Sequence, residues 1–319
     1  MATVQKFGII GLGKMGGNLA LQAMEKGFGV VGLDKSDLSP DLKSSAIVKV
    51  NTAKDLAANL TGPRVALIYV GAGPIIDTII DDLVNHFQKG DVIVDAGNSY
   101  WGDSIRRFRR LKEKGIQFID CGTSGGVNGA RHGACFMIGG EKEAVALVEP
   151  ILKKLAVPDG YVHAGQPGSG HFTKLVHNGI EFGMLQAIGE GMDLLENFRE
   201  DLDIKNILTC WNHGSVVRSW LMELMEKAYR DKNGMESIPS YVEDTGEVNW
   251  LVNDALHMEV ATPVISMSVI QLLASRDEKK NWARAIAMMR NGFGGHPFGK
   301  DDYIKKIRHT SRVGDFLKD

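Results

Sequence analysis

A glycine-rich turn near the N-terminus constrains the fold of this chain more than any other feature. Residues 4–10 (VQKFGII) are predicted to form a buried strand, and the pattern G-x-G-x-x-G follows at once, at residues 11–16. A helical pattern then runs to Gly27, and a second predicted strand, residues 29–33, ends in Asp34. The order of strand, turn, helix, strand and acid predicts a dinucleotide-binding site.

Each conspicuous residue of this motif has a physical role in such a site. Gly11, Gly13 and Gly16 let the backbone turn tightly and approach a pyrophosphate, which the free N–H groups of the following helix bind. The Asp34 carboxylate can accept hydrogen bonds from both ribose hydroxyls of NAD, and it would repel the 2′-phosphate of NADP. Because Lys35 can soften that repulsion, we expect NAD as cofactor and keep NADP as the alternative.

Strand-like and helical patterns alternate up to about residue 165. The expected strands are residues 65–70, 91–95, 116–120 and 135–138, and the expected helices are residues 52–60, 75–88, 104–114 and 142–155. This alternation predicts a mostly parallel, doubly wound sheet. Two segments rich in Gly, Asn and Ser, 95–99 and 122–130, follow predicted strands. We expect them to be loops that contact substrate, although the same residue types also form ordinary turns.

Strand signals fade after residue 165, and helical patterns replace them. A long helix is expected to carry Lys174 and to keep an apolar periodicity over residues 176–198, and further helices are expected at about residues 203–212, 215–231, 248–258, 263–275 and 278–291. The fold class is therefore α/β. A Rossmann-type domain, residues 1–165, precedes an all-helical domain for substrate binding and oligomerisation, residues 166–319.

The segment K-L-V-H-N-G-I-E carries the strongest chemical signal. Lys174, His177, Asn178 and Glu181 stand at i, i+3, i+4 and i+7, which places them on one face of a helix. A lysine and a carboxylic acid that face one pocket can serve as two proton-transfer groups. Taken alone, this helix face fits a solvent-facing Lys–Glu contact slightly better than a catalytic pair. The cofactor motif and the two loops favour a catalytic role.

Composition and charge exclude several classes of protein. A formal net charge of -2 gives no reason to expect nucleic acid, and the basic runs 106–110 and 305–312 are interpreted as solvated helix faces. Three cysteines without a C-x-x-C pair indicate a reduced, cytoplasmic protein. No signal peptide, apolar span or metal-ligand spacing is found, so neither a membrane nor a metal is expected.

Five motifs, in order, resemble the family of decarboxylating 6-phosphogluconate dehydrogenases in the β-hydroxyacid dehydrogenase superfamily. They are G-L-G-K-M-G-G-N-L, D-A-G-N-S, S-G-G-x-x-G-A, G-H-F-T-K-L-V-H-N-G-I-E and R-x-x-F-G-G-H. The resemblance is to the short form, with a single helical unit. It implies oxidative decarboxylation of 6-phosphogluconate to ribulose 5-phosphate and CO2, with hydride transfer to NAD(P), in the pentose phosphate pathway and gluconate utilisation. It also implies a homodimer or homotetramer.

The resemblance assigns roles to residues. It implies that Lys174 is the general base and Glu181 the general acid. The implied substrate contacts are Asn98, Ser124, Gly125, Gly126, His177 and Asn178, with Arg290 and His296 coming from the neighbouring subunit. The implied cofactor contacts are Gly11, Leu12, Gly13, Met15, Gly16, Asp34, Lys35 and Asn98. By spacing alone, Arg290 and His296 fit a phosphate site and a C-capping cluster equally well.

Two departures and two rival functions remain open. Phe182 stands where the long forms of the family have a tyrosine, and the segment around Glu247 lacks their lysine. Another β-hydroxyacid dehydrogenase, acting on a small acid such as 3-hydroxyisobutyrate, would share the K-x-x-x-N pair without needing Glu181. A non-catalytic dinucleotide sensor would need no Lys174.

Overall fold

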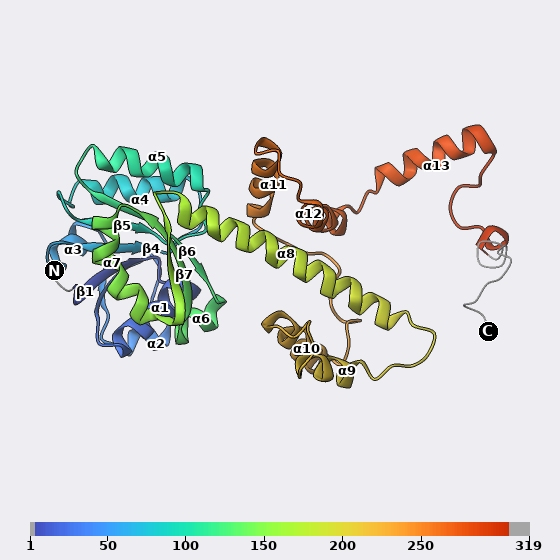
Figure 1. Cartoon of the computed structure of the whole chain (residues 1–319), viewed down its shortest axis with the longest axis horizontal. Coiled ribbons are helices and arrows are strands. Elements are labelled where there is room, and N and C mark those ends of the chain that lie inside the picture. Colours follow the sequence, from blue (N-terminus) through green and yellow to red (C-terminus); the bar gives the residue numbers. More distant parts are fainter. Residues whose placement is uncertain (1–3, 306–319) are drawn as a thin grey trace. The chain divides into compact units, whose positions relative to one another are not determined.

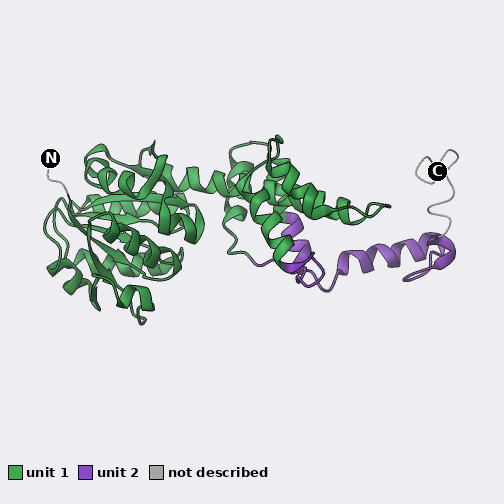
Figure 2. Ribbon diagram, turned by 90° about the horizontal axis from the view of Figure 1, so that it is seen from below, with its two compact units in different colours: residues 1–231, 244–269 green, residues 232–243, 270–319 purple. Residues whose placement is uncertain are grey.

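A computed structural model describes residues 4–305 of the 319-residue chain (Figure 1). Most of the basic run predicted at 305–312 lies outside the described residues. The chain divides into two compact units (Figure 2). The larger comprises Met1–Asp231 and Asp244–Val269, and the smaller comprises Lys232–Glu243 and Ile270–Asp319. The larger unit contains the whole sheet.

The sheet has eight strands in the order β3-β2-β1-β4-β5-β6-β7-β8. The strands are β1 (Lys6–Ile10), β2 (Gly29–Leu33), β3 (Val48–Val50), β4 (Val65–Ile68), β5 (Val92–Asp95), β6 (Gln117–Ser124), β7 (Ala134–Gly140) and β8 (Ala156–Gly165). Every neighbouring pair is parallel except β6 and β7. The prediction of an α/β chain with a mostly parallel sheet and a helical C-terminal region is therefore confirmed.

Seven helices follow the strands of the sheet or connect them. They are α1 (Lys14–Glu25), α2 (Pro40–Lys43), α3 (Ala53–Ala58), α4 (Pro74–Val84), α5 (Trp101–Lys112), α6 (Gly126–His132) and α7 (Lys142–Leu155). In Figure 1, α4 and α5 lie on one side of the sheet and α1, α6 and α7 on the other. Helices on both sides are what a doubly wound sheet requires.

The strand alternation fills two apolar cores. Phe7 and Ile9 of β1 belong to the core beneath α1 and α7, whereas Ile10 belongs to the core beneath α3 and α4. Successive side chains of a strand point to opposite faces, so a strand covered on both faces is apolar throughout. The near-continuous apolar run of β1 is the sequence signature of that arrangement.

The remaining helices follow the sheet in the chain. They are α8 (Ser169–Glu196), α9 (Ile204–Asn212), α10 (Trp220–Lys232), α11 (Glu247–His257), α12 (Pro263–Arg276) and α13 (Asn281–Gly294). The buried Asp120 carboxylate accepts the backbone N–H groups of Gly168 (2.7 Å) and His171 (2.8 Å). These bonds satisfy orphan donors at the N-terminus of α8 and tie that end to β6.

One sequence-based expectation about the elements is wrong, and two features of the sheet were not predicted. The segment 122–130 is not a loop, because it contains the end of β6 and most of α6. The strand predicted at 135–138 pairs antiparallel with β6, and this is the one antiparallel pair among the described strands of a sheet predicted to be mostly parallel. β8 was not predicted, since its exposed sequence contains Pro, Asp and Gly, which read as a turn.

Candidate active site

The polar face predicted on α8 points partly into the protein. Lys174 and Asn178 are buried, whereas His177 and Glu181 are half-buried. Lys174 Nζ lies 3.3 Å from His177 Nδ1, and Glu181 Oε2 lies 3.9 Å from the same nitrogen. A solvated Lys–Glu stripe would leave the ammonium in water, so the burial of Lys174 argues against that alternative.

The burial of Lys174 has an electrostatic consequence. Removal from water disfavours the charged ammonium and lowers the pKa of Lys174, while the Glu181 carboxylate opposes this shift. Gly122 of β6 makes the close approach of Lys174 possible, because a Cβ there would lie 2.3 Å from Lys174 Cβ. The position of Lys174 therefore depends on a residue without a side chain.

The two segments predicted to contact substrate meet this face of α8. Asn178 Nδ2 donates to Asn98 Oδ1 at 3.3 Å, in the turn between β5 and α5. Ser124 Oγ, at the end of β6, lies 3.0 Å from His177 Nε2. Gly125 and Gly126 follow with positive φ and begin α6. The structure thus brings together the predicted site residues of three separate segments.

His177 connects Lys174 to Ser124. Burial and the nearby Lys174 charge both lower the pKa of His177, which favours the neutral imidazole. His177 Nδ1 lies 3.3 Å from Lys174 Nζ and 3.4 Å from Asn178 Oδ1, and Nε2 lies 3.0 Å from Ser124 Oγ, so the tautomer sets the direction of these bonds. In the tautomer with its proton on Nε2, the ring accepts from Lys174 and donates to Ser124, which links Lys174 to β6.

The glycine-rich turn has the geometry that a dinucleotide needs. Gly11 has φ +89°, and a Cβ there would lie 2.4 Å from Tyr69 O. A Cβ at Gly16 would lie 2.0 Å from Gly11 O, whereas Gly13 faces open space. The N-terminus of α1 has no side-chain cap, so its N–H groups are available to a pyrophosphate.

A cavity of about 650 Å³ adjoins this turn. Its lining includes Gly13, Lys14, Met15, Tyr69, Val70, Gly71, Ala72, Gly73, Ala96, Gly97, Asn98, Tyr100, Asp103, Thr123, Thr245, Glu247 and Trp250. The cavity is large enough for a cofactor segment and substrate, and Asn98 faces it from the carboxyl end of β5. The residues of the turn fit NAD, and they would hold its pyrophosphate against α1.

Asp34 lies at the end of β2, as predicted. Its carboxylate accepts the backbone N–H of Leu12 at 2.5 Å and that of Ser36 at 2.7 Å. A carboxylate has about four acceptor positions, so it retains capacity for ribose hydroxyls. Lys35, beside it, is exposed. Asp34 therefore also holds the glycine-rich turn against β2, which the sequence did not indicate.

The predicted basic pair near the C-terminus belongs to the smaller unit. Arg290 lies on α13 and is exposed, and His296 follows the end of that helix. Asn291 Nδ2 donates to His296 O at 2.9 Å, and the rings of Phe293 and His296 lie 5.9 Å apart. These contacts fix the turn around His296, while a role in substrate binding stays a prediction.

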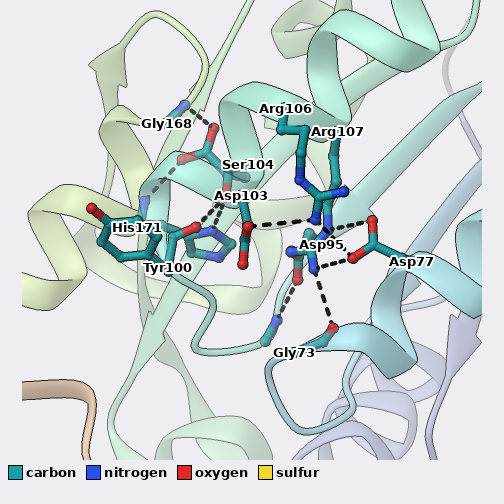
Figure 3. A network of polar contacts seen from close by, with 12 residues as sticks. Gly73, Asp77, Asp95, Tyr100, Asp103, Ser104, Arg106, Arg107, Gly168 and His171 are labelled. Carbon is teal, nitrogen blue, oxygen red and sulfur yellow. Dashed lines mark hydrogen bonds and ion pairs between the residues drawn. The ribbon is translucent and has the colours of Figure 1, made fainter. Parts of the chain in front are cut away.

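The prediction of a solvated face at 106–110 is wrong for Arg107. Arg107 is fully buried, and it forms ion pairs with Asp95 (3.1 Å) and Asp77 (2.8 Å) (Figure 3). Burial alone would raise the pKa of Asp77, yet bonds from Arg107 and Arg106 lower it. Asp95 also accepts the N–H of Gly97 at 3.2 Å, so this network braces the turn that carries Asn98.

The structure adds site residues that sequence reasoning missed. Tyr100 and Trp250 line the cavity with their rings in contact, and Glu247 lines it from the first turn of α11. The only available signal was the position of Tyr100 directly after D-A-G-N-S, because the α11 residues lie some 150 positions away. Periodicity within one segment carries no information on such distant contacts.

Within residues 4–305, no helix is long and apolar enough to cross a membrane. In the same range, no group of three or more His, Cys, Asp and Glu side chains is arranged to hold a metal ion.

The fold and the site define a dehydrogenase with a Rossmann-type, NAD-binding domain. The family model described as the NAD binding domain of 6-phosphogluconate dehydrogenase matches residues 6–165, and that of the C-terminal domain matches residues 170–315. The chain belongs to the 6-phosphogluconate dehydrogenase family.

Two curated relatives match nearly end to end. A Bacillus subtilis protein, YqeC, whose name gives 6-phosphogluconate dehydrogenase only as a provisional assignment, is 44% identical over 91% of this chain and 98% of its own. The NAD(+)-dependent, decarboxylating 6-phosphogluconate dehydrogenase of Haloferax volcanii is 36% identical over 93% of this chain and 99% of its own.

Solved structures agree on the fold. The 6-phosphogluconate dehydrogenase of Plasmodium falciparum superposes with a TM-score of 0.79 at 28% identity, covering 93% of this chain and 66% of that one. A 3-hydroxyisobutyrate dehydrogenase from Salmonella typhimurium gives 0.70 at 18% identity, covering 86% of this chain and 95% of that one, which shows a common fold alone.

Proposed function

We propose that this chain catalyses the oxidative decarboxylation of 6-phosphogluconate to ribulose 5-phosphate and CO2, with NAD as the preferred hydride acceptor. The observation that carries the proposal is the buried Lys174, which lies within reach of His177 and shares its helix face with Glu181. The similarity to named members of the family supports the same substrate.

The residues divide the chemistry between two proton carriers. Bound NAD supplies the acceptor for the hydride from C3 of the substrate. Neutral Lys174 takes the proton of the C3 hydroxyl, and its burial favours the neutral amine that this step needs. The 3-keto acid that results loses its carboxylate as CO2, since the C3 carbonyl accepts the electron pair. Protonated Lys174 donates to that oxygen.

The second half of the reaction needs an acid at the other end of the substrate. Protonated Glu181 delivers a proton to C1 of the enediol while neutral Lys174 takes the proton of the C2 hydroxyl, which yields the ketose product. Glu181 stands two helical turns beyond Lys174 and is half-buried, so it faces the same space from a wetter position. Asn98, Ser124 and Asn178 supply donors and acceptors for substrate hydroxyls in this scheme.

We assign the binding of the substrate phosphate to Arg290 and His296 of a neighbouring subunit. Among the described residues that line the cavity of the larger unit, Lys14 is the one cation, and it lies in the glycine-rich turn assigned to the pyrophosphate, whereas Asp103 and Glu247 are acidic. The substrate phosphate therefore needs further cations from elsewhere. With this assignment the protein is an obligate homo-oligomer. Residues 1–165 then form the dinucleotide-binding domain, and residues 166–319 form the domain for substrate binding and oligomerisation. Its three free cysteines fit a cytoplasmic enzyme.

A cavity with Lys14 as its one described cation also fits a rival, a β-hydroxyacid dehydrogenase whose substrate has no phosphate. A turnover assay separates the two functions: 6-phosphogluconate and 3-hydroxyisobutyrate are each supplied with NAD and with NADP, and released CO2 is measured. We expect 6-phosphogluconate with NAD to give the highest kcat/KM, with one CO2 per NADH. Faster oxidation of 3-hydroxyisobutyrate without CO2 would contradict the proposal.

A further inference from the structure

A buried carboxylate on α11 receives two hydrogen bonds from consecutive residues of the Rossmann region. Asp254 Oδ1 accepts from the Tyr100 hydroxyl at 3.0 Å, and Oδ2 accepts from Trp101 Nε1 at 2.7 Å. Asp254 is 6% exposed. A buried carboxylate is costly unless its oxygens are paired, so the two donors explain how it is tolerated.

The two donors are placed directly after a substrate-contacting turn. Asn98 and Ser99 precede Tyr100, which is the N-cap residue of α5. The Tyr100 ring lies 5.7 Å from that of Trp250 and lines the cavity, while the Trp101 ring lies 6.1 Å from that of Phe172 on α8. Tyr100 and Trp101 thus connect the segment that carries Asn98 to α11 and α8.

The helix that carries Asp254 also forms a wall of the cavity. Glu247 and Trp250, in the first turn of α11, line it. α11 packs closely on α8, because a Cβ at Gly179 would lie 2.4 Å from Leu251 Cδ2. α8 carries Lys174. The Asp254 bonds therefore join the wall that bears Asn98 to the two helices that bear Lys174 and Trp250.

We propose that Asp254 is a positioning residue of the dehydrogenase site, which fixes the Asn98 wall of the cavity relative to α8 and α11. The inference rests on the proposed function, since Asn98 matters through that reaction. Asp254 is not among the residues that line the cavity beside the glycine-rich turn. It acts through Tyr100 and Trp101, and an error of about 1 Å in the placement of a substrate-binding group can cost about 100-fold in rate.

The chemistry of the pair distinguishes two substitutions. Asp254→Ala leaves two half-buried donors without this partner. Asp254→Asn keeps both contacts, because its oxygen accepts from Trp101 while its NH2 donates to the Tyr100 oxygen. A positioning role requires hydrogen-bond partners and not the charge, so the asparagine variant rescues function and the alanine variant does not.

The experiment compares these two variants with Val148→Ala, a core truncation on α7 that is buried away from the cavity lining. Melting temperature, kcat, KM and the Kd of NAD without substrate, from tryptophan quenching, are measured for each. We expect Asp254→Ala to lower kcat/KM about 100-fold and to weaken NAD binding about tenfold. Asp254→Asn should stay within about threefold of wild type.

A double-mutant cycle tests whether Asp254 acts through Tyr100. Tyr100→Phe combined with Asp254→Ala should lose little more NAD affinity than Asp254→Ala alone. An Asp254→Ala variant that matches Val148→Ala in Kd and kcat/KM at equal loss of melting temperature would overturn the proposal, as would additive losses in the cycle. If wild type does not turn over 6-phosphogluconate, the proposed function fails, and the NAD affinities alone decide the role of Asp254.

Discussion

The first turns of α8 and the whole of α13 differ in how far their residues are buried. In α8, Gly170, Lys174 and Asn178 are buried against the sheet. In α13 no described residue is buried, and Trp282 and Phe293 are 64% and 76% exposed. Both helices carry predicted site residues, yet among the described residues only α8 has side chains buried within its own unit.

This difference indicates which part of the candidate site is built by residues of a single unit. Lys174 has its hydrogen-bond partner, its low-dielectric environment and its close approach to β6 from residues of the same unit. Large aromatic side chains exposed on α13 are costly in water and are typical of a surface that another chain covers. The contrast supports the proposal that Arg290 and His296 serve a neighbouring subunit. The following predictions test it in order of expected effect.

The largest effect is expected at the proton carriers. Lys174→Met should lower kcat about 100-fold or more, the usual scale for a general base, and Glu181→Gln should do the same for the acid. Substrate binding should change less. Steady-state kinetics with Lys142→Met, an exposed lysine on α7, as control checks this. Near-normal turnover by either variant would refute its assigned role.

The second effect is recovery of activity by mixing subunits. Lys174→Met and His296→Ala chains should each be nearly inactive. After equal mixing and reassembly, half of the dimers contain both chains, and each has one intact site, so about a quarter of wild-type activity should return. Differently tagged chains verify the mixing by co-purification. A fully active monomer, or no recovery in verified mixed dimers, would exclude a shared site.

A third effect is expected where β6 meets α8. Gly122→Ala should displace Lys174 and lower kcat/KM about tenfold or more. Burial lowers the pKa of Lys174, so activity in wild type falls only when pH drops below that lowered value. Displacement of Lys174 toward water in the variant raises the pKa of its amine. The acidic limb of the pH–kcat/KM profile should therefore move to higher pH. Gly189→Ala, which faces open space on α8, is the control; an unmoved limb would contradict this explanation.

The smallest effect concerns the cofactor. Asp34→Asn removes a charge that repels the 2′-phosphate of NADP, and it weakens the acceptor for the ribose hydroxyls. The ratio of kcat/KM for NAD over NADP should fall by about tenfold, the scale of one charge-assisted hydrogen bond. Part of the loss with NAD will reflect the Leu12 bond. A wild-type enzyme that already prefers NADP strongly would disprove this role of Asp34.

The sequence predicted the parts of the molecule in which one short segment contains the whole signal. The glycine motif, β2 and α7 were predicted at or near their observed bounds, because caps, glycines and periodicity are local. The arrangement of Lys174, His177, Asn178 and Glu181 on one helix face also followed from spacing. Their meeting with Asn98 and Ser124 was expected from the rule that strands of such a sheet end at one edge.

The missed features depend on contacts between distant segments. The burial of Arg107 comes from Asp77 and Asp95, and nothing within R-R-F-R-R distinguishes it from its exposed neighbour Arg106. The antiparallel entry of β7 depends on its pairing with β6, since its own sequence fits either direction. The pairing of Tyr100 with Asp254 spans 154 positions and gives no local pattern.

The ion pair of Arg107 with Asp95 has a consequence for how variants of this chain are interpreted. Both side chains are fully buried, and removal of one partner leaves an uncompensated charge in the interior. A mutational survey that measures only loss of activity would give Arg107 and Lys174 similar scores, although Arg107 does not line the cavity. During evolution, a substitution at Arg107 is therefore tolerated only together with one at Asp95. Covariation between them in related chains would therefore reflect buried charge and not a shared role in catalysis.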